Sequence, residues 1–105
     1  MYDIQQAVVR ISEFTQGKRF EDYQSEAMLR AAVERQFEII GEALVRLARL
    51  DQELAAQVSE HRRIIAFRNI LIHGYADVDD RLVWDFAQTR VPALLREVEA
   101  LLAEG

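Results

Sequence analysis

An apolar stripe in the middle of the chain constrains the fold more than any other feature of this sequence. Its members recur at intervals of four, four, three, four and three residues: Leu29, Val33, Phe37, Ile40, Leu44 and Leu47. Such spacing places them on one face of an α-helix. A second row widens the buried face: Ala32, Ile39 and Ala43. We therefore expect a helix that Ser25 caps and that ends near Leu50, with Gly41 allowing another helix to approach closely.

Shorter stretches before and after this helix have related patterns. Residues 3–16 carry apolar side chains at helical spacing, and Gly17 is placed to end that helix. Residues 20–23 predict a short connector whose aromatic rings anchor it to the other helices. Asp51 is a predicted cap for a short helix that runs through Val58.

The second half of the chain predicts two more helices. Ser59 is expected to cap a helix over residues 60–72, and Asp79 is expected to cap the last helix after a turn at 73–78. The single proline, Pro92, removes one backbone hydrogen bond and predicts a kink there.

These patterns predict an all-α fold. No segment has the alternating period of a strand, and short loops between long amphipathic helices are typical of antiparallel bundles. We expect one domain over residues 1–105: an up-and-down bundle of four long helices with one short helix.

Composition narrows the function classes. The chain has no cysteine, which excludes disulfides and thiolate metal sites and fits a reducing cytoplasm. No stretch has the length and apolarity of a membrane span or of a signal-peptide core. The net charge of −5 argues against a broad basic surface for DNA or other long nucleic acid. Any RNA contact must be local, with these basic candidates: Arg62, Arg63 and Arg68, with Lys18 and Arg19 expected nearby.

A cluster of polar residues interrupts and ends the apolar run after position 63. Arg68 and Asn69 stand within it, and His73, Gly74 and Tyr75 close it. Gly74 suits the left-handed position just past a helix end. If the helix ends just before or at His73, the guanidinium, the imidazole and the phenol can converge on one pocket.

The spacing Arg68-x4-His73-x-Tyr75 resembles the Arg-x4-His-x-Tyr motif of HEPN-domain proteins, specifically the HepT-type toxins. The segment 32–43 resembles the long second helix of that family. Residues 78–92, with their Val-Asp start and their proline, resemble the beginning and kink of its last helix. The likeness covers nearly the whole chain.

The resemblance implies a metal-independent endoribonuclease without a cofactor. Arg68 would hold the scissile phosphate, and His73 would transfer protons during attack by the RNA 2′-hydroxyl. Asn69 would support this site by orienting the phosphate or His73. Since one arginine and one histidine make a sparse site, a homodimer built on the motif helix and the second long helix would supply a second copy.

The resemblance also implies a toxin–antitoxin pair. In HepT-type toxins the tyrosine at the position of Tyr75 receives AMP from a cognate MntA-type nucleotidyltransferase antitoxin. Two alternatives stay open. The chain could be a non-catalytic HEPN module that binds such a nucleotidyltransferase, or a helical dimerisation protein whose motif is structural.

Structural interpretations of the same residues also stay open. Arg68 could be a surface arginine with a buried stem, and His73 a helix-capping residue. Asn69 could equally be a buried amide. His61 is expected to be exposed and Trp84 to lie in the core.

An acidic row on the long helix has two interpretations as well. Glu34, Glu38 and Glu42 recur every four residues beside Arg35, which favours a solvated face with local ion pairs. In the alternative, one glutamate pairs with Arg68.

Two further classes are disfavoured. A di-iron bundle needs Glu-x-x-His pairs, and neither histidine has a glutamate three residues before it. A DNA-reading helix would need a more polar face than residues 60–72 offer.

Overall fold

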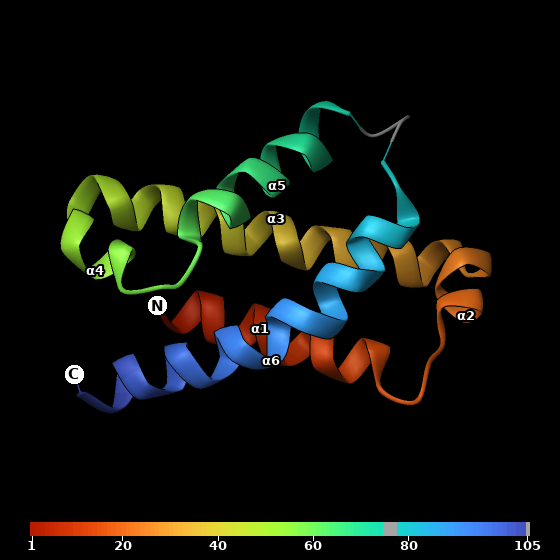
Figure 1. The fold of residues 1–105 in the computed structure, drawn as a ribbon, viewed down its shortest axis with the longest axis horizontal. Coiled ribbons are helices and arrows are strands. Elements are labelled where there is room, and N and C mark those ends of the chain that lie inside the picture. The colour runs from red at the N-terminus through yellow and green to blue at the C-terminus, as the bar shows by residue number, and fades with distance from the viewer. Residues whose placement is uncertain (75–77, 105) are drawn as a thin grey trace.

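The fold consists of helices throughout the part of the chain that the structure describes. The computed structural model covers residues 1–74 and 78–104 (Figure 1). Its helices are α1 (Tyr2–Thr15), α2 (Phe20–Ser25), α3 (Ala27–Leu50), α4 (Gln52–Ala56), α5 (His61–His73) and α6 (Asp80–Glu104). The predicted all-α bundle of four long helices is confirmed, and α2 adds a second short helix to the one that was predicted.

Helix α3 is the centre of the arrangement. It packs against α1 and α5, and α1 packs in turn against α6. Figure 1 shows α1, α3, α5 and α6 running in alternating directions, with α5 on one side of α3 and with α1 and α6 on the other. None of the described helices has the length and apolarity needed to cross a lipid bilayer.

The core is built from the apolar faces of these four helices. Three aromatic rings join α3, α5 and α6: the ring centres of Phe37 and Phe67 lie 5.2 Å apart, and those of Phe67 and Phe86 lie 4.5 Å apart. Trp84 is buried, as predicted, and stacks at a tilt on buried Tyr23. Truncating a core ring to alanine costs about 3–5 kcal/mol, so these contacts hold α5 and α6 in place.

The region between α1 and α3 differs from the sequence-based expectation. Residues 20–23, predicted as a connector, begin the helix α2. Asp22 starts it by accepting a hydrogen bond from the Arg19 backbone N–H at 2.9 Å. The prediction that Ser25 caps α3 is wrong, because Ser25 ends α2 and donates its hydroxyl hydrogen to the Asp22 carbonyl.

Two of the predicted aspartate caps are confirmed. Asp51 accepts a hydrogen bond from the Leu54 N–H at 3.1 Å and caps α4, which ends two residues before the predicted Val58. Asp79 accepts hydrogen bonds from the N–H groups of Arg81 and Leu82 at the start of α6. Both short carboxylates satisfy N–H groups that have no partner inside their helix.

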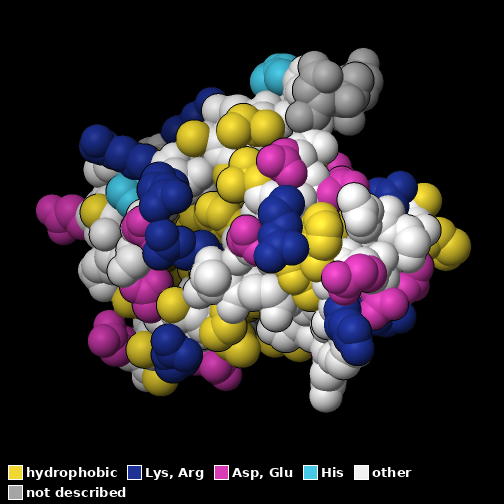
Figure 2. All heavy atoms as spheres, turned by 45° about the vertical axis from the view of Figure 1, so that its right-hand side comes forward, with side chains coloured by type: hydrophobic (Ala, Val, Ile, Leu, Met, Phe, Trp, Pro, Cys, Tyr) yellow, Lys and Arg dark blue, Asp and Glu magenta, His cyan; other side chains and the backbone are white. Residues whose placement is uncertain are grey.

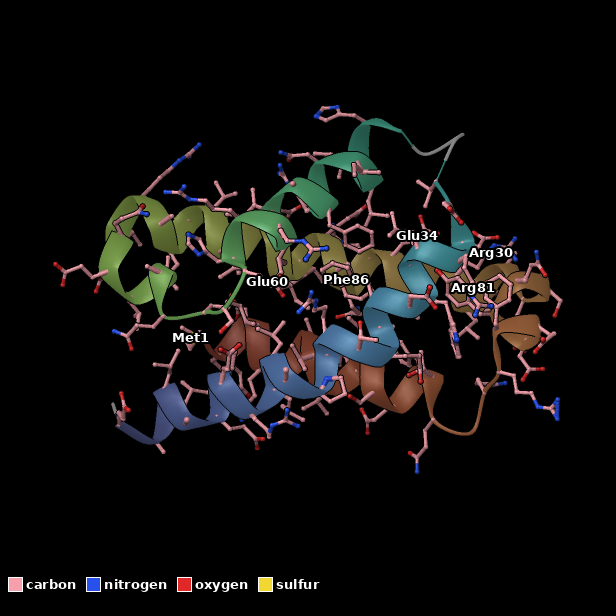
Figure 3. All side chains as sticks on the ribbon, viewed as in Figure 1. Met1, Arg30, Glu34, Glu60, Arg81 and Phe86 are labelled. Atoms are coloured by element: carbon pink, nitrogen blue, oxygen red, sulfur yellow. The ribbon has the colours of Figure 1, made fainter. Side chains whose placement is uncertain are left out.

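The start of α5 is held by a tertiary contact instead of a serine cap. Ser59 donates from its backbone N–H and its hydroxyl to Glu97 of α6, so the prediction that it caps α5 is wrong. The N-cap residue is Glu60, which adopts a left-handed conformation with φ 58°. Glu60 also pairs with Arg63 and Arg90, and Figure 3 shows it at the start of α5.

Pro92 lies inside α6. Figure 1 shows that this helix changes direction along its length, in agreement with the predicted kink. The valines on either side of the Asp79 cap support its start, since Val83 is buried and Val78 packs against the core.

Candidate functional site

Helix α5 carries the motif residues Arg68 and His73 together with Asn69, and Arg68 is the one that faces α3. Its side chain is half-buried, and its stem lies against Gly41. A β-carbon placed on Gly41 would lie 2.5 Å from Arg68 Cγ and closer still to Arg68 Cβ. The predicted close approach at Gly41 is therefore confirmed, and the group that approaches is the root of the arginine.

The head of Arg68 is held by its neighbour in the chain. Its Nη1 donates a hydrogen bond to Asn69 Oδ1 at 2.8 Å, while its Nε is buried and has no hydrogen-bond partner within residues 1–74 and 78–104. Asn69 is exposed, so the interpretation of this residue as a buried amide is wrong. Its described contact orients the guanidinium.

Helix α5 ends at His73, which is the later of the two predicted ends. The helix includes His73, which is exposed. Gly74 has φ −116°, so the predicted left-handed conformation is wrong, and its N–H continues the helical pattern by donating to the Ile70 carbonyl at 2.8 Å. Arg68 and His73 thus stand five residues apart on an unbroken helix, about 140° apart around its axis.

The third group of the predicted pocket is the phenol of Tyr75. Tyr75 lies outside the described residues, and so does the predicted contact of its phenol with Arg68 and His73. Among the described residues, no hydrogen bond joins Arg68 to His73. A single chain therefore presents the guanidinium and an exposed imidazole on different sides of the same helix.

An apolar groove runs beside this helix, between α5 and the start of α6. It has a volume of about 210 Å³ and is lined by Arg63, Ala66, Phe67, Ile70, Leu82 and Phe86. Ile70 and Leu82 remain 48% and 46% exposed, although both are large apolar side chains. Figure 2 shows hydrophobic atoms at the surface between basic side chains.

Basic residues gather at the beginning of α5. Arg62 and Arg63 are exposed, and His61 beside them is half-buried, in contrast to its predicted exposure. The segment around Lys18 lies at the opposite edge of the molecule in Figure 1. The expectation that Lys18 and Arg19 are near the α5 arginines is therefore wrong.

The predicted local ion pairs are confirmed for Glu38 and Glu42 on α3, whereas the predicted solvated face is wrong at Glu34, which is half-buried. Arg35 lies 3.2 Å from Glu38 and 3.7 Å from Glu42. In the described part of the chain Arg68 has no ion pair, so the alternative pairing with a glutamate is not found there.

A second titratable cluster, which the sequence analysis missed, lies where α2, α3 and α6 meet. Burial raises the pKa of the Glu34 carboxyl, and the charges of Asp80 and Glu38 add to this rise, while Arg30 opposes it. Burial also raises the pKa of the Tyr23 hydroxyl. Figure 3 shows Arg30 and Glu34 near the start of α6, where Arg81 lies. The sequence carries no signal for this cluster, because folding brings together residues that are far apart in the chain: Tyr23, Glu34 and Asp80.

Other parts of the described surface do not extend the site. A hollow of about 490 Å³ lies between α1 and α6 and includes none of the motif residues. No group of three or more Asp, Glu or His side chains suited to a metal ion occurs within residues 1–74 and 78–104.

The matching family model and the curated proteins that resemble this chain agree on one family. A family model described as "Ribonuclease HepT-like" matches residues 4–101. The chain is 34% identical to the "Probable ribonuclease HepT" of Thermococcus cleftensis. The alignment spans 99 residues and covers 94% of this chain and 89% of the relative. The chain is also 34% identical over 99 residues to a candidate RNase of Methanocaldococcus jannaschii, MJ1380, covering 94% and 90%. No solved structure gives a significant match.

Proposed function

The chain belongs to the HepT-like ribonuclease family, and on that premise we propose that it is a metal-independent endoribonuclease in which Arg68 and His73 act on RNA. One observation supports this assignment most directly. The guanidinium of Arg68 is held by Asn69 on the same helix that ends in an exposed histidine, His73. A fixed cation and an imidazole are the two groups that cleavage of RNA without a metal needs.

The reaction that these groups support is transesterification within the RNA. An imidazole removes the proton of the 2′-hydroxyl, the 2′-oxygen forms a bond to phosphorus, and the bond from phosphorus to the 5′-oxygen breaks. A protonated imidazole delivers a proton to the leaving 5′-oxygen. Arg68 binds the nonbridging oxygens and neutralises the charge that builds on them. The products carry a 2′,3′-cyclic phosphate and a 5′-hydroxyl.

A homodimer accounts for the geometry of the single subunit. Because Arg68 and His73 point about 140° apart on one helix, a second copy of the motif can supply the missing partner of each group. The outer face of α5 offers an apolar surface for such pairing, with Ala66 and Ile70 exposed beside Leu82 of α6. We therefore include in the proposal a twofold pairing through α5, supported by α3.

We further propose that the ribonuclease is a toxin and that an MntA-type nucleotidyltransferase neutralises it by transferring AMP to Tyr75. The added phosphate would occupy the arginine and block access to the imidazole. A Tyr75→Phe chain should remain toxic when the antitoxin is co-expressed. Intact-mass measurement of the wild-type chain after co-expression should show one added AMP, and the absence of this adduct would contradict the modification.

Single substitutions test the ribonuclease itself. Arg68→Ala and His73→Ala should each lower RNA cleavage by about 100-fold or more, while helical content is retained. Arg46→Ala and His61→Ala are matched controls that should cleave RNA normally. Wild-type cleavage should persist in excess EDTA.

The results also separate the alternatives. Full cleavage by either motif variant would contradict the proposed site. A wild-type chain that binds a nucleotidyltransferase but cleaves no RNA would support the non-catalytic module instead.

A further inference from the structure

We infer that Gly41 is a positioning residue for Arg68: its missing side chain lets the arginine stem lie against α3 and so fixes where the guanidinium emerges. The contact itself is independent of any activity. Its consequence for RNA cleavage rests on the proposed function.

The position of Gly41 inside α3 shows that this glycine does not serve to end a helix or form a turn. Of the described glycines, Gly17 and Gly74 follow helix ends, whereas Gly41 is buried inside the 24-residue helix α3. Glycine is a poor residue inside a helix, because it leaves the unfolded backbone more freedom than alanine does. A glycine at a buried helical position therefore needs a packing reason.

The contact with Arg68 supplies that reason. An alanine β-carbon at position 41 would lie 2.5 Å from Arg68 Cγ, 3.4 Å from its Cδ and closer than either to its Cβ. The nearest of these atoms form the root of the arginine, so they cannot swing aside as a flexible tip would. Because Cβ is fixed by the backbone, a change of rotamer moves only Cγ and Cδ, and α5 must also move away from α3.

The two ends of Arg68 are thus fixed by different residues. Gly41 receives the stem, and Asn69 accepts a hydrogen bond from Nη1 at 2.8 Å. Between these contacts the Nε is buried. A guanidinium held in this way needs little reorganisation when a phosphate binds, and small displacements of such a group reduce catalysis strongly.

A stability cycle tests the contact without any assay of activity. Gly41→Ala should lower the urea midpoint of the wild-type chain because of the clash. In an Arg68→Gly chain, which lacks the Cβ and Cγ that obstruct the methyl group, the same substitution should raise the midpoint, since alanine favours the helix. Equal shifts in the two backgrounds would overturn the inference. The double variant relieves the clash, so the comparison does not depend on the single variant folding fully.

Kinetics then test whether the contact positions Arg68 for catalysis. Gly41→Ala should lower kcat by about 10-fold or more and leave KM within about threefold, because the guanidinium is misplaced for the transition state. Ile40→Val, a mild core substitution on the same helix, controls for lost stability and should leave kcat near that of the wild type. In an Arg68→Gly chain, which lacks the obstructing Cβ as well as the guanidinium, Gly41→Ala should have less than about a twofold further effect.

The stability cycle and the kinetic comparison contradict different parts of the inference when their expected results are not found. Multiplicative losses of kcat in the two backgrounds would mean that Gly41 does not act through Arg68. If the wild-type chain cleaves no RNA, the proposed function fails, and the stability cycle still decides whether Gly41 fixes the arginine. The ¹⁵N–¹H signal of Arg68 Nε gives an independent reading: it should exchange slowly with solvent in the wild type and faster in Gly41→Ala.

Discussion

Two buried polar atoms of this protein, one in Tyr23 and one in Arg68, have different surroundings and different expected effects on stability. The hydroxyl of Tyr23 and the Nε of Arg68 are both buried without a hydrogen-bond partner in the described residues. Tyr23 lies in the core, where its ring packs on Trp84 while its hydroxyl lies near the charges of Glu34 and Asp80. Arg68 lies in the motif, where burial of Nε accompanies the fixing of its head.

This contrast leads to a prediction for Tyr23. Tyr23→Phe keeps the ring and removes an oxygen that has no described partner, so stability should be unchanged or rise by up to about 1 kcal/mol. Urea unfolding at neutral pH checks this, with Tyr2→Phe as a control because Tyr2 is 64% exposed. A loss of about 2 kcal/mol or more would reveal a partner for the hydroxyl.

Glu34 gives a prediction about pH. Its pKa in the folded protein is raised above the ordinary value of 4.5, mainly by burial. The folded state therefore binds the proton more tightly than the unfolded state does, and stability falls as pH rises from 4.5 through the raised pKa. Glu34→Gln cannot ionise, so it should lack this fall and should have a higher Tm than the wild type near pH 7.

Thermal unfolding of both chains between pH 4 and pH 8 provides the measurement. The difference in Tm between Glu34→Gln and the wild type should grow over this range as the wild-type carboxyl ionises. A difference that stays constant with pH would contradict the assigned cause.

Individual side chains were predictable where one local property decides their place. Gly41 and Trp84 were assigned correctly, because a glycine inside a helix and a large apolar ring on the last helix each have few favourable places. The partner of Gly41 could not be predicted, since it depends on the register of α3 against α5. His61 was assigned wrongly, because its half-burial comes from neighbours that are distant in sequence.

Whole elements were predictable in proportion to their length. The long periodic stripe fixed the extent of α3 to within a few residues, while residues 20–23 are too few to show a period and α2 was missed. Asp51 and Asp79 act as caps, as predicted, but Ser25 and Ser59 do not. A serine that can cap a helix can equally bond elsewhere, and the sequence does not reveal which it does.

Ser59 illustrates an element held by a distant partner. Its N–H and hydroxyl both donate to Glu97, which ties the turn before α5 to α6. Ser59→Ala removes the hydroxyl bond and should cost about 0.5–1.5 kcal/mol of stability. Urea unfolding checks this, and Ser25→Ala is the matched control, since the described hydrogen bond of exposed Ser25 lies within α2 and its loss should change stability by less than about 0.5 kcal/mol. Equal costs at the two serines would contradict a tertiary role.

The molecule as a whole is a flattened bundle, with extents of 40 × 28 × 17 Å. In it, α5 packs mainly on α3 and leaves the groove beside α6 open. Arg68 could be located on α5 from the sequence, whereas His73, predicted in the turn at 73–78, is the last residue of this helix. Their convergence could not be predicted, because it depends on where α5 ends and on whether a second subunit faces it. His73 is the last residue of α5 and lies about 140° around the helix axis from Arg68, so a second subunit is needed to bring such groups together.

The proposed dimer predicts a specific effect of charge on the α5 surface. Ile70→Glu should convert a dimer into a monomer in sedimentation velocity at micromolar concentration, since burying an unpaired carboxylate in an apolar interface is unfavourable. Ile70 is already 48% exposed in the single chain, so the variant should stay folded by circular dichroism. Met28→Glu is the control, because Met28 is 88% exposed in the first turn of α3. A wild-type chain that sediments as a monomer would contradict the pairing.

A sharper consequence follows if each site takes its arginine from one subunit and its histidine from the other. A mixture of Arg68→Ala and His73→Ala chains, each inactive alone, would then form heterodimers in which one of the two sites has both groups. With equal amounts of the two chains and random exchange, half of the dimers are mixed, so cleavage should recover to about a quarter of the wild-type rate. Adding Ile70→Glu to both chains should abolish the recovery by preventing assembly. Homodimers that form normally, with no recovery of cleavage in the mixture, would place both groups of each site in one subunit and contradict the composite site.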